Sequence, residues 1–197
     1  VLADDVTPDD EEFDLFVREV AREMTVKAGQ KCTAIRRALV PRRHLDAVAE
    51  RLKARLGRIV VGDPALEGVK MGPLASHAQQ ADVAERVALL REHAELVCGG
   101  GTDVIPLGAG TDHGAFFAPT LLLSRDPWRD AAVHDVEAFG PVSTLMPFDS
   151  MDEAVELAAR GRGSLVASLV TRSPKVAAQV VPAMAALTGL AAMTMII

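Results

Sequence analysis

Short apolar runs alternate with helix-forming segments along the whole 197-residue chain, and this alternation limits the possible folds more than any other feature. In the longer segments the apolar residues recur every three to four positions, which is typical of amphipathic helices. The short runs are nearly continuous, which is typical of strands that are buried on both faces. The sequence therefore predicts an α/β fold, a three-layer αβα domain with a largely parallel sheet.

Caps and apolar spacing set the expected boundaries of the elements. Thr7 is the expected cap of the first helix, with Pro8 at its first position and Gly29 as its end. Ser76 is the expected cap of a later helix, and Ser150 opens a capping box. The expected helices cover residues 8–28, 45–56, 77–94, 151–160 and 174–187. The expected strands cover residues 38–40, 58–61, 95–98, 116–123, 142–146, 165–171 and 190–197.

Composition and charge exclude several classes of function. The formal charge of −6 argues against a general nucleic-acid partner. No apolar run is long enough to span a bilayer and no signal-peptide pattern is present, so we expect a cytoplasmic protein that binds no membrane. Two cysteines cannot form a disulfide framework, and no Cys/His cluster has zinc spacing, so no metal site is expected. The apolar ends, residues 1–2 and 189–197, predict a domain from a longer polypeptide.

One of the two cysteines lies in a basic stretch, VKAGQKCTAIRR, at residues 26–37. A reactive thiol needs nearby positive charge and partial access to solvent, whereas a structural thiol is a small buried hydrophobe. The loop position and the polar flanks of Cys32 favour a nucleophile, and an ordinary thiol is the alternative. Cys98 ends the apolar run ELVC and is expected in the core. The basic residues around Cys32 are Lys27, Lys31, Arg36 and Arg37.

A second stretch, EAFGP at residues 137–141, precedes an expected strand. Ligands gather at strand ends in α/β sheets. The carboxylate of Glu137 could hold ribose hydroxyls, and the ring of Phe139 could pack on a nicotinamide. The alternative is a solvated glutamate and a core phenylalanine.

Other patterns add no site. The glycine groups at 99–101 and 161–163 complete no phosphate-binding loop, so they are interpreted as turns. The five histidines are scattered along the chain. A Cys–His protease pair stays open, because such partners meet in space rather than in sequence.

Together, GQKCTAIRR and EAFGP resemble the two signature stretches of the aldehyde dehydrogenase superfamily. Between them VGDP, MGP and FFAPT occur in the order that is found there. The residues in and around these stretches are most similar to those of the semialdehyde dehydrogenases of bacterial phenylacetate catabolism, which are fused to an oxepin-CoA hydrolase. The semialdehyde dehydrogenases of benzoyl-CoA degradation are a similar subgroup.

The resemblance implies a role for each candidate residue. Cys32 would be the nucleophile that forms a thiohemiacetal and then a thioester, while its backbone N–H helps to hold the oxyanion. Glu137 would bind the nicotinamide-side ribose, and Phe139 would shape the nicotinamide site. Gln79 would lie near the adenine-side ribose, and Arg37 would be structural. The implied cofactor is NADP or NAD.

The resemblance also implies partners and a larger protein. The substrate would be a small-molecule aldehyde, a CoA-thioester semialdehyde, and the protein would be a homo-oligomer with a fused hydratase domain. In the superfamily the general-base glutamate, the oxyanion-hole asparagine and the nucleotide-binding domain precede this segment. Residues 1–197 are therefore expected to be the cysteine-bearing catalytic domain, without steady-state activity alone. A CoA-acylating aldehyde dehydrogenase and a catalytically silent binding or assembly module are the alternatives.

Overall fold

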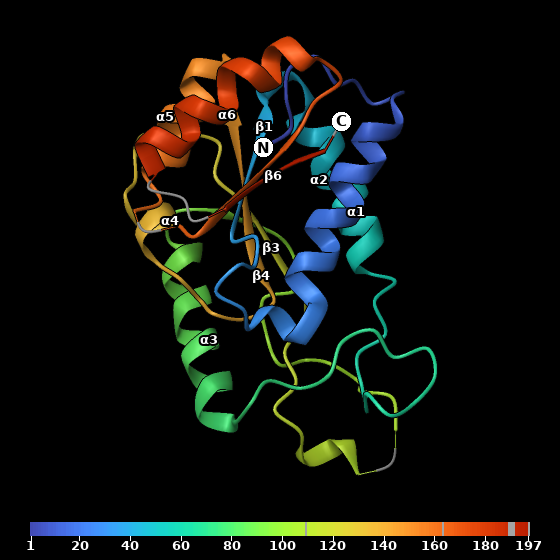
Figure 1. Ribbon diagram of the computed structural model, residues 1–197. Helices are drawn as coiled ribbons and strands as arrows, with labels where there is room; N and C mark the ends of the chain where they lie inside the picture. The colour runs from blue at the N-terminus through green and yellow to red at the C-terminus, as the bar shows by residue number, and fades with distance from the viewer. Residues whose placement is uncertain (109, 163, 189–191, 197) are drawn as a thin grey trace.

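The computed structural model describes residues 1–108, 110–162, 164–188 and 192–196, which form two β-sheets with helices on both faces (Figure 1). The larger sheet has the strand order β1 (Arg37–Pro41), β4 (Val142–Phe148), β3 (Thr120–Leu123) and β2 (Glu95–Cys98). Its first three strands are parallel, and β2 is an antiparallel edge. The smaller sheet pairs β5 (Val166–Val170) with β6 (Ala192–Ile196) in parallel. The expected α/β fold with a largely parallel sheet is confirmed.

The first three residues connect the two sheets. The N–H of Leu2 donates to the carbonyl oxygen of Leu39 in β1 at 2.9 Å. On the other side, Ala3 N–H donates to Val170 O in β5, and Val170 N–H donates to Val1 O, both at 2.9 Å. Leu2 also forms a parallel bridge with Val170. The chain start therefore lies as an extended segment between β1 and β5.

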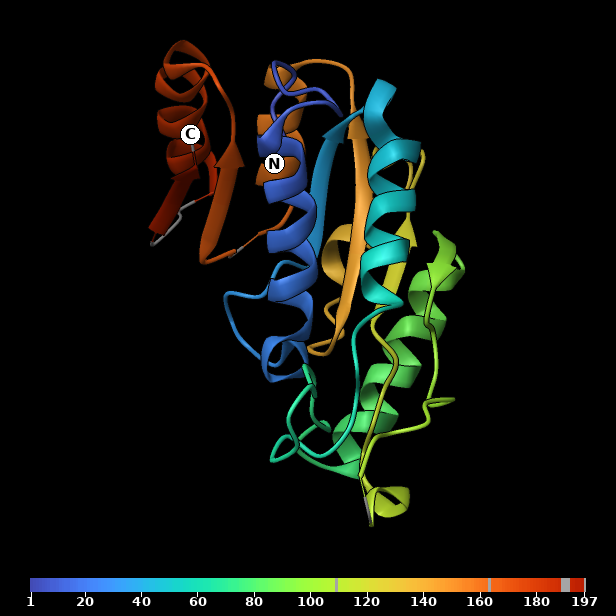
Figure 2. The same ribbon diagram turned by 90° about the vertical axis from the view of Figure 1, so that its right-hand side faces the viewer.

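Helices form the outer two layers, and Figure 2 shows the sheet between them. The helices α1 (Glu11–Thr25) and α2 (Leu45–Leu56) pack together on one face. The opposite face carries α5 (Met151–Ala159) and α6 (Pro174–Thr188), which also contact each other. The helices α3 (His77–Arg91) and α4 (Ala132–Asp135) contact each other. This arrangement confirms the three-layer expectation.

Successive side chains of a strand point to opposite faces, so neighbouring residues of the central strands belong to different cores. In β1, Ala38 and Val40 belong to the core beneath α1 and α2, whereas Leu39 belongs to the core beneath α5 and α6. In β3, Leu121 faces the first of these cores, and Leu122 packs with residues of α3. The strands β1, β3 and β4 are thus buried on both faces, as their continuous apolar runs predict, whereas the edge strand β2 is partly exposed.

Two expected elements are wrong. The first helix begins at Glu11 rather than at Pro8, because the carboxylate of Asp10 accepts bonds from the N–H and hydroxyl of Thr7 at 2.7 and 2.8 Å. Thr7 therefore closes a turn before the helix and does not cap it. The apolar run at 58–61 forms no strand, since it makes only isolated backbone contacts, among them a bridge between Val61 and Met71 and bonds from Lys70 N–H to Val60 O and from Leu107 N–H to Val61 O.

Two expected caps are confirmed. The hydroxyl of Ser76 accepts from Gln79 N–H at 3.1 Å, and the hydroxyl of Ser150 accepts from Glu153 N–H at 3.2 Å. The carboxylate of Glu153 reaches back to Asp149 N–H at 2.6 Å, one residue before the cap. The last expected strand is present as β6, and positions 190, 191 and 197 of that expectation lie outside the described residues.

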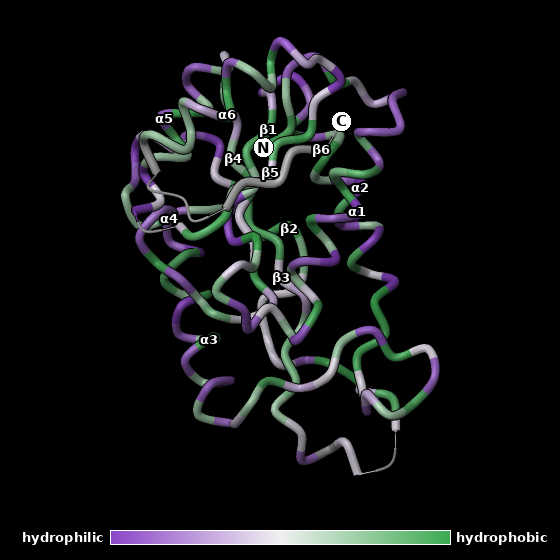
Figure 3. The backbone as a smooth tube through the Cα atoms, viewed as in Figure 1, coloured by the Kyte–Doolittle hydropathy of each residue, from purple (hydrophilic) through white to green (hydrophobic). Residues whose placement is uncertain are grey.

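Hydropathy follows the layers. In Figure 3 most of α3 is hydrophilic in colour, which agrees with its small buried set of Val83, Val87 and Leu90. Across the described ranges, no helix combines the length and apolarity that a membrane crossing needs. Within the same ranges, no group of three or more His, Cys, Asp or Glu side chains has a metal-binding arrangement.

Candidate active site

The loop that carries Cys32 begins with an unusual backbone. After α1 the chain makes a 3₁₀ turn over Val26–Gly29, in which Lys27, Ala28 and Gly29 have φ angles of 54°, 50° and 70°. The left-handed region is unfavourable for residues with a Cβ atom, so two of these three positions are strained. Cys32 follows three residues later and is exposed to solvent. Such strain persists only where surrounding contacts hold it.

One of those contacts joins the two candidate stretches. A Cβ atom on Gly29 would overlap the carbonyl oxygen of Gly140 and lie 2.5 Å from its carbon and 2.9 Å from Pro141 N. The backbones of the two stretches are therefore in direct contact, although 111 residues separate Gly29 from Gly140 in sequence (140 − 29). Only glycine satisfies both the close approach and the left-handed conformation here.

The start of α3 supports both stretches. The side-chain amide of Gln30, two residues before Cys32, accepts from Ala75 N–H at 3.0 Å. One turn along the helix, Gln79 Nε2 donates to the carbonyl oxygen of Phe139 at 3.2 Å. Phe139 itself has a φ of 48° and is 41% exposed. The segment from Ala75 to Gln79 therefore holds the cysteine loop and the Phe139 turn in fixed relation.

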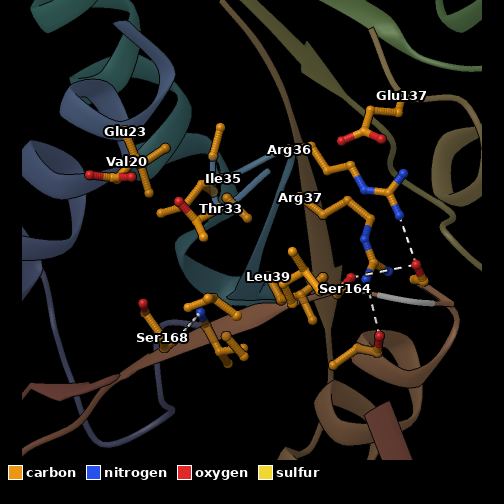
Figure 4. Close-up of a pocket in the computed structure, with 18 of the residues that line it drawn as sticks. Val20, Glu23, Thr33, Ile35, Arg36, Arg37, Leu39, Glu137, Ser164 and Ser168 are labelled. Carbon is orange, nitrogen blue, oxygen red and sulfur yellow. Dashed lines mark hydrogen bonds between the residues drawn. The ribbon is translucent and has the colours of Figure 1, made fainter. Parts of the chain in front are cut away.

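A cavity of about 800 Å³ lies beside these two stretches, and Cys32, Glu137 and Phe139 all line it. Figure 4 shows Arg37, the first residue of β1, and Arg36 just before it side by side at this cavity, with Glu137 near Arg36. Glu137 is exposed, so its carboxylate is accessible from the cavity. Gln79 does not line the cavity, and its side chain contacts the Phe139 backbone instead.

Two basic residues next to Cys32, Lys31 and Arg36, have partners on other elements. Lys31 pairs with Glu23 of α1 at 2.5 Å, and Arg36 Nη2 donates to Gly161 O at 2.8 Å. Both contacts fix the ends of the Cys32 loop to neighbouring elements. They do not aim positive charge at the thiol.

Arg37 lies on the cavity wall and is held at the end of α5. Its guanidinium donates to the carbonyl oxygens of Leu157 and Ala158 at 2.8 and 3.0 Å, and Nη1 lies 3.0 Å from His134 Nδ1. A Cβ atom on Gly161 would overlap the guanidinium. Burial, and then the charge of Arg36, lower the pKa of Arg37 to about 10. These contacts support the structural role that the sequence assigned to Arg37.

His134 is the residue that sequence reasoning missed. It is 2% exposed, lies in α4 three residues before Glu137, and lines the same cavity. Burial lowers its pKa below the ordinary value, as do the charges of Arg37 and Arg160. The nearby EAFGP stretch was the available signal, but the partner Arg37 lies 97 residues away in sequence.

Cys98 differs from Cys32 as expected. It is half-buried at the end of β2 and packs against the core beneath α1 and α2. Burial raises the pKa of its thiol. The exposed thiol of Cys32 is therefore the accessible one of the two.

The residues on the cavity wall fit a nicotinamide cofactor in their chemistry. An accessible carboxylate at Glu137 can accept hydrogen bonds from ribose hydroxyls, and the exposed ring of Phe139 offers a flat apolar surface. Both residues lie at the amino end of β4, in a turn held by α3. The cavity wall thus holds two groups suited to a nucleotide and one thiol suited to a carbonyl carbon.

Known proteins give an independent identification. The model of the aldehyde dehydrogenase family matches residues 6–189. A 3,4-dehydroadipyl-CoA semialdehyde dehydrogenase of Aromatoleum evansii is 46% identical over 96% of this chain, which covers 37% of that enzyme. Protein MaoC of Klebsiella aerogenes is 44% identical over 54% of this chain and 30% of its own length.

Solved structures agree with the sequence matches. A betaine aldehyde dehydrogenase of Staphylococcus aureus, with NAD+ and a BME-modified cysteine, has a TM-score of 0.84 at 26% identity, covering 98% of this chain and 37% of that one. A mutant aldehyde dehydrogenase of Pseudomonas syringae, with NAD+ and octanal, has a TM-score of 0.80 at 29% identity, covering 96% and 37%. The chain thus spans little more than a third of these relatives, and it belongs to the aldehyde dehydrogenase family.

Proposed function

We propose that residues 1–197 are the cysteine-bearing catalytic domain of a longer enzyme that oxidises an aldehyde with NADP or NAD. The single observation that carries this proposal is the contact of Gly29 with Gly140 and Pro141. It brings Cys32, Glu137 and Phe139 to one cavity. A nucleophile and a cofactor-binding group must share a site if hydride is to leave an adduct on the thiol.

The thiol of Cys32 would attack the aldehyde carbonyl carbon, forming an S–C bond and a thiohemiacetal, while the backbone N–H of Cys32 stabilises the oxyanion. A nicotinamide bound there would accept the hydride that leaves the adduct carbon, which gives a thioester on Cys32; attack of water on the thioester carbonyl would then release the acid and the thiol. Glu137 would accept hydrogen bonds from the nicotinamide-side ribose, and Phe139 would form one wall of the nicotinamide site. The strained loop before Cys32 keeps the sulfur atom at the cavity, which orients it for attack.

The proposed substrate is a CoA-thioester semialdehyde from the breakdown of an aromatic compound. The name of the Aromatoleum relative, 46% identical, supports this class. Two substrates follow from the sequence resemblance and this relative, namely 3-oxo-5,6-dehydrosuberyl-CoA semialdehyde and 3,4-dehydroadipyl-CoA semialdehyde. We propose that the enzyme is a cytoplasmic homo-oligomer. A hydratase domain in the same polypeptide would indicate the first of the two substrates.

The direct test is turnover by the protein that the full reading frame encodes. We expect NADP or NAD to be reduced in the presence of either semialdehyde, with the free acid as product. Residues 1–197 alone are expected to show no steady-state turnover. Release of a new CoA thioester instead of the acid would favour the CoA-acylating alternative. No reduction of either cofactor by the full-length protein would refute the proposal.

Alkylation separates an enzyme from a silent module. We expect iodoacetamide near neutral pH to modify Cys32 at least about tenfold faster than Cys98, because the thiolate is the reacting form and burial raises the pKa of Cys98. Peptide mass spectrometry over a time course measures both rates. Bound cofactor should change the rate at Cys32 only. Equal slow modification, or modification only after unfolding, would favour the silent module.

A further inference from the structure

We propose that Arg37 and His134 form a strut that positions the turn carrying Glu137, and that protonation of His134 loosens this turn. The inference rests on the proposed function of Glu137 in cofactor binding. It assigns a positioning role to two residues that the proposed chemistry does not itself use.

The hydrogen bonds of His134 define the protonation state of its ring. Arg37 can only donate, so the 3.0 Å contact makes Nδ1 of His134 an acceptor. The carbonyl oxygen of Pro127 can only accept, so Nε2, at 2.7 Å, carries the hydrogen. One ring nitrogen accepts and the other donates only in a neutral imidazole. The strut as the structure shows it therefore requires His134 to be neutral.

The two ends of the strut lie in the two halves of the site. Arg37 begins β1, five residues after Cys32, and its guanidinium is fixed by the last carbonyl groups of α5. His134 lies in α4, and the N–H of Val136 donates to Ala132 O at 2.9 Å, which continues the turn toward Glu137. Because this backbone is short and hydrogen-bonded, a displacement of α4 would also displace Glu137.

The charges around His134 set the direction of its response to pH. Arg37 of β1 and Arg160 at the end of α5 oppose protonation, and Asp135 of α4 favours it. In the described part of the chain, α3 adds no further charge to this set, although it also contacts α4. Burial is the largest influence, and the pKa of His134 is lowered from its ordinary value of 6.5.

The sign of the effect follows. Above pH 6.5 the ring is neutral and the strut is intact. As the pH falls through the lowered pKa, a hydrogen on Nδ1 would point at the guanidinium of Arg37, and two cations would face each other. Acidification is therefore expected to break the contact and release the turn.

The test compares the full-length enzyme with its His134→Gln variant from about pH 8 down to the lowest pH at which both stay folded, because the pKa of His134 is lowered from 6.5. Glutamine keeps one acceptor and one donor but does not titrate in this range. For the unaltered enzyme we expect the KM for NADP or NAD to rise about tenfold on acidification, with a smaller change in kcat, because one hydrogen bond to a charged group is lost. In the variant this rise should be absent.

The matched control is His44→Gln. His44 is also buried, also accepts from an arginine, Arg43, at 3.2 Å, and also has a pKa lowered by burial. It lies before α2, away from the cavity lining, so its variant should keep the pH dependence of the unaltered enzyme. An identical pH dependence in the unaltered enzyme and in His134→Gln would overturn the proposal.

Hydrogen exchange provides a readout that does not depend on activity or on a foldable variant. After correction for intrinsic rates, backbone amides of residues 131–138 in the unaltered full-length protein should exchange faster as the pH falls, and those of α2 should not. Unchanged protection of residues 131–138 would overturn the strut. By contrast, absence of cofactor reduction at every pH would refute the proposed function and leave this exchange result to decide the strut.

Discussion

Cys32→Ser is expected to lower kcat of the full-length enzyme by at least about a thousandfold, since a serine hydroxyl is a far weaker nucleophile than a thiolate. The exposed position of Cys32 on the cavity wall means that the substitution removes little packing. Binding of NADP or NAD should therefore change little, because Glu137 and Phe139 remain. Steady-state kinetics and a fluorescence titration with the reduced cofactor measure the two effects separately.

Cys98→Ser is the control for this variant. Its side chain packs against the core and does not line the cavity, so kcat should stay within about twofold while stability falls by roughly 1 kcal/mol, as expected for a polar replacement at a half-buried position. A Cys32→Ser enzyme with near-normal kcat would contradict the assignment of the nucleophile.

Gly29→Ala is expected to have a large structural effect. The new Cβ would overlap the carbonyl of Gly140, and the left-handed φ of 70° adds its own cost. Together these predict a loss of about 3 kcal/mol of stability or more. If the loop moves to relieve the overlap, a shift of the thiol by about 1 Å would lower kcat/KM about a hundredfold. Thermal unfolding and kinetics of the full-length protein measure both.

Gly68→Ala separates the two causes. Gly68 also has a left-handed φ, 90°, but nothing lies within 4 Å of the added Cβ. Its variant should show only the conformational cost, about 1 kcal/mol, and unchanged kcat/KM. Equal effects of the two substitutions would show that the contact between residue 29 and residues 140–141 does not hold the site together.

Much of the fold was predictable because local signals and tertiary packing agree. Ser76 and Ser150 cap their helices as their positions predict, and the apolar runs of β1, β3 and β4 are buried on both faces. The errors occurred where a local signal had a competing partner. The carboxylate of Asp10 accepts the hydrogen bonds of Thr7, which therefore does not cap the helix. The run at 58–61 forms an isolated bridge rather than pairing with a neighbouring strand.

The candidate site was predictable only in part. The choice of Cys32, Glu137 and Phe139 as candidates came from two short sequence stretches, and the structure places all three on one cavity, while their roles stay a prediction. The contact of Gln79 with Phe139 O and the pair of Arg37 with His134 could not be predicted. Both depend on the register of strands and helices that lie far apart in sequence, and no local pattern encodes this register.

The position of residues 1–3 between β1 and β5 also affects the order in which contacts can form during synthesis. During synthesis, Leu2 meets its first neighbour, Leu39, early, but its second neighbour is Val170. At ribosomal rates of 5–20 residues per second, roughly 7 to 26 seconds separate the emergence of the two partners. The backbone contacts of residues 1–3 with β5 can therefore form only after most of the chain has been synthesised.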